Sequence, residues 1–243
     1  MEMAVGSRVR SEVAGPGPVL ALDTSTDRAA VVLDPGGGTL WLAPAIASRQ
    51  HGRGLVAAIR DLLGQRGIGP GELAAIGVGL GPGSFTGLRV GLTAAKTLAY
   101  AVGCPLFGFD SLEAIARNAP GEARAVVAVG DAQRGDLFVA DFAREGDALR
   151  RVGPTRLERA DTWPSTLAPG TWVLGPPLGR AEPWWPDSIR RGDPSIGYPE
   201  GGALMALTRE RIASGRSDDP WFLEPAYVRR SAAEEKAAGV VGA

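Results

Sequence analysis

The sequence predicts an α/β fold built from two similar halves, each a mixed sheet flanked by helices. One pattern occurs at 20–33 and again at 126–142: an apolar strand that ends in aspartate, a polar turn and a second apolar strand. In the first half this pattern is followed by a helical run, a short strand and a glycine-rich loop that opens a second helical run. The recurrence of one pattern within the chain suggests an internal duplication.

The composition excludes several classes of function. With 243 residues the chain is long enough for one large or two small domains. Its 26 basic and 27 acidic residues give a net charge of -1, so direct binding to RNA is not expected. One cysteine cannot form an internal disulfide, and the sequence shows neither a signal-peptide core nor an apolar run of roughly 20 residues that could span a bilayer. We therefore expect a cytoplasmic protein without membrane contact.

The first half contains strands and helices whose boundaries follow from local signals. Apolar runs separated by polar and glycine-rich turns predict an antiparallel meander of three strands. Apolar residues at helical spacing, interrupted at Gly67, then predict an amphipathic helix of about 17 residues. The expected strands are 19–22, 28–33, 39–42, 74–78 and 104–109, and the expected helices are 48–66, 86–102 and 111–117.

The segment 79–91 is the glycine loop, with five glycines in thirteen residues. Ser84 precedes a helical run and is a typical N-cap, so the loop predicts a strand end, a tight turn and a helix start. The free N–H groups of such a helix start suit a phosphate or carboxylate. The residues of this possible anion site are Gly81, Gly83, Ser84, Phe85, Thr86, Gly87 and Arg89.

The sequence predicts the elements of the second half only in part. Strands are expected at 126–131, 136–142, 149–152 and 171–174 and a helix at 203–213, whereas 161–199 is rich in Pro, Gly and Trp and shows no clear pattern. The predicted division is a disordered leader at 1–17, a first subdomain at 18–109, a second at 110–221, a tail at 222–231 that returns to the first subdomain, and a frayed end at 232–243.

Two rounds of three strands plus helices are typical of the duplicated actin-like fold of actin, sugar kinases and Hsp70, the ASKHA proteins with RNase H-like subdomains. In that architecture the two opening turns face one cleft, where nucleotide phosphates and a metal bind. We therefore expect the carboxylates of Asp23 and Asp131 to face each other across the cleft.

An ATP-binding phosphotransferase or ATPase is one interpretation of these features, since phosphoryl transfer needs carboxylates and a phosphate cradle. Two residues oppose it: Ser25 stands where kinases of this architecture usually have glycine, and Thr86 stands where the G-x-G-x-x-G fingerprint needs glycine. A zinc site is not expected, because His51 is the single histidine and Cys104 the single cysteine. No G-x-S-x-G elbow occurs either. We expect no catalytic residue, no metal and no cofactor.

Four motifs together resemble the TsaB (YeaZ) family over about residues 18–231. They are LALDTST at 20–26, GLGPGSFTGLRVGLTAAKTLA at 79–99, AVGDAQRGDLFVADF at 128–142 and EPAYVRR at 224–230. The second motif is long and specific, while the first and last are short. The resemblance places Asp131, Arg134 and Gly135 on the second acidic turn and Glu224, Pro225, Tyr227 and Arg229 on the tail motif.

This resemblance implies a non-catalytic subunit that pairs with a TsaD-like catalytic subunit as a heterodimer. Members lack the H-x-x-x-H metal site of TsaD, and a peptidase activity is disfavoured for the same reason. Together with a TsaE-like ATPase, the pair transfers a threonylcarbamoyl group to adenosine in ANN-decoding tRNAs, so tRNA is met only through the complex. A homodimer is a possibility when the chain is alone.

The resemblance also implies an interface, because family members associate through the two helices of the first subdomain, here 48–66 and 86–102. The residues expected at this interface are Leu55, Ile59, Leu88, Gly91, Leu92 and Ala95. The small residues Gly87, Gly91 and Ala95 recur every four positions, a row that permits close approach of another element. Two interpretations of this row stay open: packing on the chain's own sheet, or contact with a partner.

Overall fold

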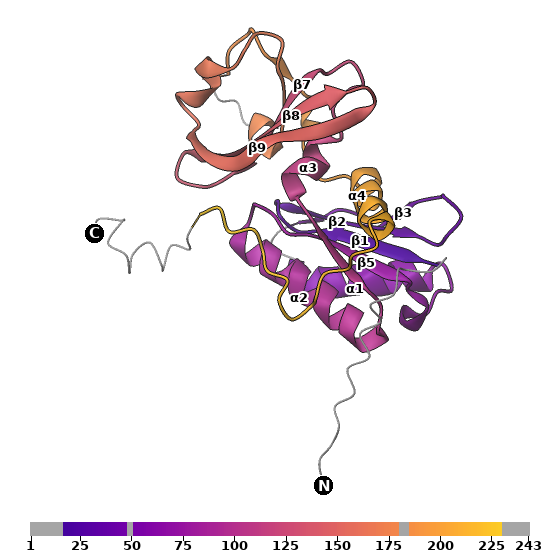
Figure 1. The fold of residues 1–243 in the computed structure, drawn as a ribbon. Coiled ribbons are helices and arrows are strands. Elements are labelled where there is room, and N and C mark those ends of the chain that lie inside the picture. The colour runs from indigo at the N-terminus through magenta and orange to yellow at the C-terminus, as the bar shows by residue number, and fades with distance from the viewer. Residues whose placement is uncertain (1–16, 48–50, 180–184, 230–243) are drawn as a thin grey trace, which may run out of the picture.

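Two sheets built around short apolar strands form the two lobes of the molecule (Figure 1). The computed structural model describes residues 17–47, 51–179 and 185–229. The strands of the first sheet are β1 (Val19–Asp23), β2 (Arg28–Asp34), β3 (Trp41–Leu42), β4 (Ile46–Ala47), β5 (Ala75–Gly79) and β6 (Leu106–Phe109). Those of the second are β7 (Ala125–Asp131), β8 (Asp136–Glu145), β9 (Ala148–Arg159), β10 (Trp172–Leu174) and β11 (Arg190–Arg191).

The two sheets share one topology. The first has the order β3-β2-β1-β5-β6, with β4 also paired to β2, and the second has the order β9-β8-β7-β10-β11. In each, the first three strands form an antiparallel meander and the last two run parallel to the first strand. Both lobes therefore repeat the strand order 3-2-1-4-5, and the predicted duplicated actin-like fold is confirmed.

The helices cover the two sheets unequally. Those of the chain are α1 (His51–Gly64), α2 (Phe85–Val102), α3 (Ser111–Ala116) and α4 (Gly201–Ala213), with short 3₁₀ turns η2 (Pro70–Glu72), η3 (Trp163–Thr166), η4 (Pro176–Gly179) and η5 (Pro194–Ile196). In the first lobe, α1 and α2 lie on one face of the sheet and α4 on the other (Figure 1). In the second lobe the connections equivalent to α1 and α2 contain η3 and η4, where prolines at 164, 176 and 177 disfavour a longer helix.

Two helices are exchanged between the lobes. Helix α4 follows the second sheet in sequence, but its Leu204 and Met205 lie in the core cluster that contains Val19 and Phe107 of the first sheet. Helix α3 follows the first sheet and packs on β7 and β8 of the second. Residues 201–213 fall within the predicted second subdomain at 110–221, and their apolar side chains are buried on the first sheet.

The observed elements differ from the expected ones mainly at their ends. The strand expected at 39–42 is reduced to Trp41–Leu42, whereas the strand expected at 149–152 extends through β9. Gly153 and Pro154 interrupt the apolar pattern of β9, and its edge position in the sheet tolerates them. Residues 48–50 of the first predicted helix, the leader up to residue 16 and the frayed end at 232–243 lie outside the described residues. Within the described ranges, no helix is both long enough and apolar enough to cross a membrane.

The contact between Gly77 and α4 tests how the first lobe is packed. A Cβ at Gly77 would overlap the Thr208 side chain, so Gly77→Ala must displace α4 from the sheet. We expect the free energy of unfolding to fall by about 1–3 kcal/mol, measured by urea titration. Adding Thr208→Ala should recover part of the loss, because the two changes share one contact.

Gly52→Ala is the matched control, since a Cβ at Gly52 in α1 meets no atom within 4 Å. This control should not lose stability, because alanine is the better helix former. If Gly77→Ala unfolded at the same urea concentration as the unaltered chain, the close packing of α4 on β5 would be contradicted.

Candidate functional site

The glycine loop connects β5 to α2 and packs on the first acidic turn, residues 23–27. Ser84 caps α2, its Oγ accepting a hydrogen bond from the Gly87 N–H at 3.2 Å. The Ser84 N–H donates to the Ser25 carbonyl oxygen at 2.7 Å. A Cβ at Gly83 would overlap the same carbonyl. The loop therefore needs glycine in order to lie against the turn of its own chain.

The small residues of α2 make room for Thr24. The Thr24 hydroxyl donates to the Gly87 carbonyl oxygen at 2.7 Å. A Cβ at Gly87 would overlap the Thr24 carbonyl oxygen, and one at Gly91 would overlap the Thr24 hydroxyl. Of the two interpretations of the small-residue row, the structure supports packing within the chain.

Asp23 joins three parts of the first lobe. Its side chain is fully buried, and Oδ1 accepts hydrogen bonds from the Ser25 N–H at 2.7 Å and the Ser25 hydroxyl at 2.6 Å. Oδ2 accepts from the hydroxyl of Ser111, the first residue of α3, at 2.6 Å. The same hydroxyl accepts from the Gly81 N–H at 3.0 Å. This carboxylate therefore ties β1, the glycine loop and α3 together.

The predicted anion site is arranged differently from an open phosphate cradle. The N–H groups of Gly81, Ser84 and Gly87 all donate to oxygens of the chain itself. Phe85 and Arg89 lie at the surface, where the Arg89 guanidinium stacks 3.8 Å from the Phe85 ring centroid. Thr86 is also exposed. Three of the expected donors thus stabilise the loop and the helix start.

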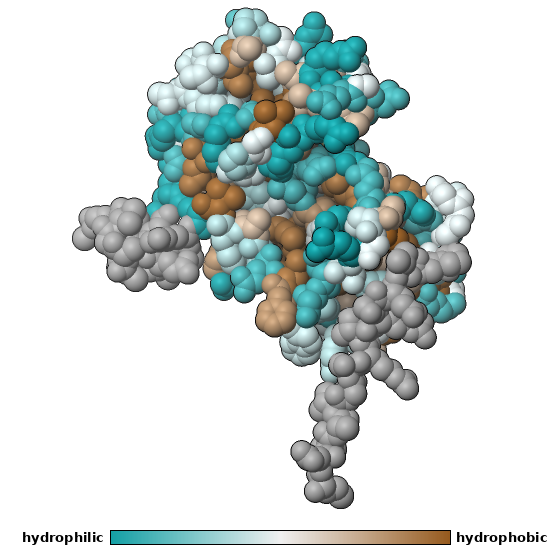
Figure 2. All heavy atoms as spheres, viewed as in Figure 1, coloured by the Kyte–Doolittle hydropathy of each residue, from teal (hydrophilic) through white to brown (hydrophobic). Residues whose placement is uncertain are grey.

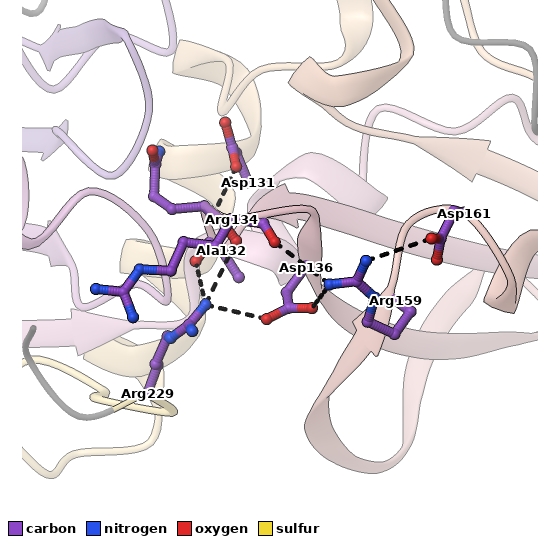
Figure 3. A network of polar contacts seen from close by, with 8 residues as sticks. Asp131, Ala132, Arg134, Asp136, Arg159, Asp161 and Arg229 are labelled. Atoms are coloured by element: carbon purple, nitrogen blue, oxygen red, sulfur yellow. Dashed lines mark hydrogen bonds and ion pairs between the residues drawn. The ribbon is translucent and has the colours of Figure 1, made fainter. Parts of the chain in front are cut away.

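The second acidic turn, residues 131–136, has an unusual backbone (Figure 3). Gln133 and Arg134 adopt positive φ angles of 66° and 56°, a region that residues other than glycine seldom occupy. Asp131 Oδ1 accepts from the Gln133 N–H at 2.7 Å and so holds the turn from inside. Side chains from elsewhere hold it from outside, since Asp136 pairs with both Arg159, at 3.3 Å, and Arg229, at 3.1 Å.

Asp23 and Asp131, which were predicted to face each other across a cleft, have different environments. Asp23 is buried within the first lobe, whereas Asp131 is partly exposed at the end of β7. Among the described residues, no group of three or more His, Cys, Asp and Glu side chains is placed to hold a metal ion. A cavity of about 920 Å³ lies between α3, α4 and the turn after β8, and its lining residues include none from the glycine loop or either acidic turn.

The side chains predicted at the partner interface lie in the core of the first lobe. Leu55 and Ala95 are 0% exposed, and the others are buried almost as completely. The six residues are Leu55, Ile59, Leu88, Gly91, Leu92 and Ala95. Helical periodicity identified the apolar face correctly, but this face is covered by the chain's own sheet. A partner that binds α1 and α2 from outside meets other side chains.

Sequence reasoning missed the residues that complete these turns. Ser111 was expected only at a helix start and Asp136 only at the start of a strand, and Arg159 lay in none of the expected elements. Pairing between Arg159 and Asp161 lowers the pKa of the Asp161 carboxyl, first because of the hydrogen bond from the guanidinium. No spacing signal predicts the contact of Ser111 with Asp23 or that of Asp136 with Arg159, because these partners lie 88 and 23 residues apart along the chain.

The chain matches the model of a known protein family. The model described as "TsaD: tRNA N6-adenosine threonylcarbamoyltransferase" matches residues 19–163, which is more than half of the chain. The chain belongs to this family. Its match with one member, the tRNA N6-adenosine threonylcarbamoyltransferase of Sorangium cellulosum, is 37% identical over 110 residues. That match covers 39% of this chain and 31% of the other protein, so the chain spans about a third of that transferase.

Other relatives of the TsaD family match over more of their own length. An uncharacterized protein of Mycobacterium tuberculosis is 33% identical over 214 residues, which cover 87% of this chain and 92% of that protein. The tRNA threonylcarbamoyladenosine biosynthesis protein TsaB of Bacillus subtilis is 29% identical over 145 residues, or 60% of this chain and 63% of that one.

Solved structures show the same relationship. YeaZ of Pseudomonas aeruginosa superimposes with a TM-score of 0.74 at 26% identity, covering 87% of this chain and 99% of YeaZ. A second Pseudomonas aeruginosa structure, titled as similar to peptidase YEAZ, gives 0.73 at the same identity. The predicted resemblance to TsaB (YeaZ) is therefore confirmed, and the family supports a role in tRNA modification.

Asp23 offers a test of whether the first turn is structural. Asp23→Ala leaves the hydroxyls of Ser25 and Ser111 without their buried acceptor, so we expect the free energy of unfolding to fall by about 3 kcal/mol. Urea titration measures the loss. Asp27→Ala is the control, because Asp27 lies exposed in the same turn and its replacement should have little effect. Equal unfolding midpoints for the two variants would show that the Asp23 contacts do not stabilise the lobe.

Proposed function

We propose that the chain is a non-catalytic subunit that binds and activates a TsaD-like enzyme in threonylcarbamoyl transfer to tRNA. The observation that carries this proposal is the burial of the carboxylate in the first acidic turn. Asp23 is fully buried, and its oxygens accept three hydrogen bonds from Ser25 and Ser111. A carboxylate that binds magnesium or acts as a base must reach the ion or the substrate. The burial of Asp23 and its hydrogen bonds within the chain prevent this access.

The outer face of α1 and α2 is the proposed docking surface. Among the described residues, nine large apolar or aromatic side chains are exposed, and six of them lie on α1, on α2 or on residues 221–227, in the segment that crosses α2. These six are Val56, Phe85, Tyr100, Trp221, Phe222 and Tyr227. Exposed apolar groups concentrated on one surface are typical of a protein interface. In Figure 2 apolar residues interrupt the hydrophilic surface of the lower lobe on the face that the tail crosses.

The docking surface combines apolar and polar groups. The exposed positions of α2 include Arg89, Thr93, Thr97 and Tyr100, which recur at helical spacing along one face. On α1 the exposed side of the helix carries Val56, 63% exposed. The proposed surface uses the two helices predicted for the interface, with their outward side chains in place of the six buried ones. Leu92→Glu would place a charge in the core of the first lobe, so this variant would test folding and not binding.

The wider assembly follows from this role. A TsaE-like ATPase joins the pair of subunits, and tRNA is bound only by the assembled complex, consistent with the net charge of -1. The chain acts in the cytoplasm without a cofactor of its own. When the catalytic subunit is absent, the same exposed face allows two copies of the chain to form a homodimer.

The docking surface is tested by co-purification with the TsaD-like subunit of the same organism. Val56→Glu and Tyr100→Glu place charges on α1 and α2 where exposure is 63% and 62%, so the fold should be retained. We expect binding weakened by roughly tenfold or more for each, as measured by calorimetric titration, because an unpaired charge is desolvated at the interface.

Val152→Glu provides the matched control. Val152 is 53% exposed on β9 of the second lobe, away from the docking surface, and its variant should bind as the unaltered chain does. Unchanged binding of both helix variants, or an equal loss with the control, would exclude the proposed surface.

A further inference from the structure

The segment Asp218–Arg229, called the strap here, contacts both lobes. It begins at the free edge of the first sheet. The Asp218 N–H donates to the Leu106 carbonyl oxygen at 2.8 Å, and the Asp218 carboxylate accepts from the Gly108 N–H at 2.7 Å. One aspartate thus supplies both a donor and an acceptor to β6, as a neighbouring strand would. The Arg211 guanidinium of α4 also lies 3.3 Å from the Asp218 carboxylate.

The middle of the strap runs along α2 (Figure 1). Leu223 packs against the core cluster of the first lobe, and the Ala226 N–H donates to the carbonyl oxygen of Leu80 in the glycine loop at 2.8 Å. The Tyr227 ring lies 5.3 Å from that of Phe85, and its hydroxyl accepts from Arg89 at 3.1 Å. Up to Tyr227 the strap therefore belongs to the first lobe.

The last two described residues of the strap belong to the second lobe. Val228 packs against the core cluster of that lobe. The Nη1 atom of Arg229 donates to the carbonyl oxygens of Ala132 at 2.9 Å and Gln133 at 3.3 Å, and lies 3.1 Å from Asp136 Oδ2 (Figure 3). The guanidinium therefore satisfies acceptors of the second acidic turn that would otherwise suit a cation.

We propose that the strap is a conformational lock that holds the two lobes at one angle, with Arg229 as its anchor on the second lobe. The strap passes from the first lobe to the second between Tyr227 and Arg229. A rotation of one lobe against the other must therefore stretch or break the contacts of these residues. Covalent connections between two lobes permit hinge motion, whereas an additional contact at the ends of both lobes opposes it. The Asp136 and Arg229 side chains are each 22% exposed, so their ion pair is partly shielded from water and salt.

The lock also explains the strained backbone of the second turn. Gln133 and Arg134 hold positive φ angles, and such residues persist only where surrounding contacts fix them. Arg229 from the strap and Arg159 from β9 both bond to carbonyl oxygens of this turn or to Asp136. The turn is therefore shaped as a receptor for the strap. This inference does not depend on the proposed partner, because the contacts lie within one chain.

The lock is tested by the distance between spin labels on the two lobes, measured by double electron–electron resonance. Thr39→Cys and Val152→Cys place labels at exposed positions of the first and second lobes. The native Cys104 should remain unlabelled, because burial excludes the reagent and raises the pKa of its thiol to about 12. Dilution with unlabelled chain removes distances between copies.

We expect one narrow distance distribution for the labelled chain and a distribution at least twofold broader after Arg229→Met, which keeps the apolar stem but removes the guanidinium. Val228→Ser should broaden it as well. Arg150→Met is the control, because Arg150 is an exposed arginine of the same lobe that pairs with Glu145. Circular dichroism verifies that each variant is folded. A broad distribution in the unaltered protein, or a distribution in Arg229→Met as narrow as before, would overturn the proposal.

Discussion

The first lobe depends on the fully buried carboxylate of Asp23. Asp23 is tolerated in the interior because donors from Ser25 and Ser111 satisfy its oxygens, and an unsatisfied buried carboxylate would be costly. Satisfying it fixes the first turn against the end of β1 and brings the start of α3 to the same point. The glycine loop must then pass close by, and a side chain at Gly79 would overlap the carboxylate. Several glycines of the glycine loop are therefore required by packing.

This constraint connects the fold to the proposed role. The features that suggest a phosphate site in the sequence, a glycine loop and a capped helix, are used inside the lobe to position α2. The inner face of α2 is occupied by Thr24 and the sheet, so only its outer face, which the strap partly covers, can contact another molecule. The strap lies along this helix and reaches the second acidic turn through Arg229. The docking surface and the angle between the lobes are thus physically linked through α2.

Local signals in the sequence predicted much of the fold. The Ser84 cap was sufficient for the start of α2, and the repeated strand, aspartate and turn pattern was sufficient for the duplicated topology. Contacts between elements that are distant in the sequence could not be predicted. Periodicity shows that a face of α1 or α2 is apolar, but it does not show that the covering element is the chain's own sheet. The exchange of α3 and α4 between lobes, and the pairing of Asp218 with the edge of β6, likewise carry no signal in residue spacing.

Calorimetric titration of the isolated chain with Mg-ATP, combined with an assay for phosphate release, tests the central claim most directly. If the glycine loop and Asp23 serve packing, the chain should show neither tight stoichiometric binding nor turnover, and addition of the TsaD-like subunit should give saturable binding under the same conditions. Stoichiometric, tight ATP binding with turnover by the isolated chain would contradict the account and favour a phosphotransferase or ATPase.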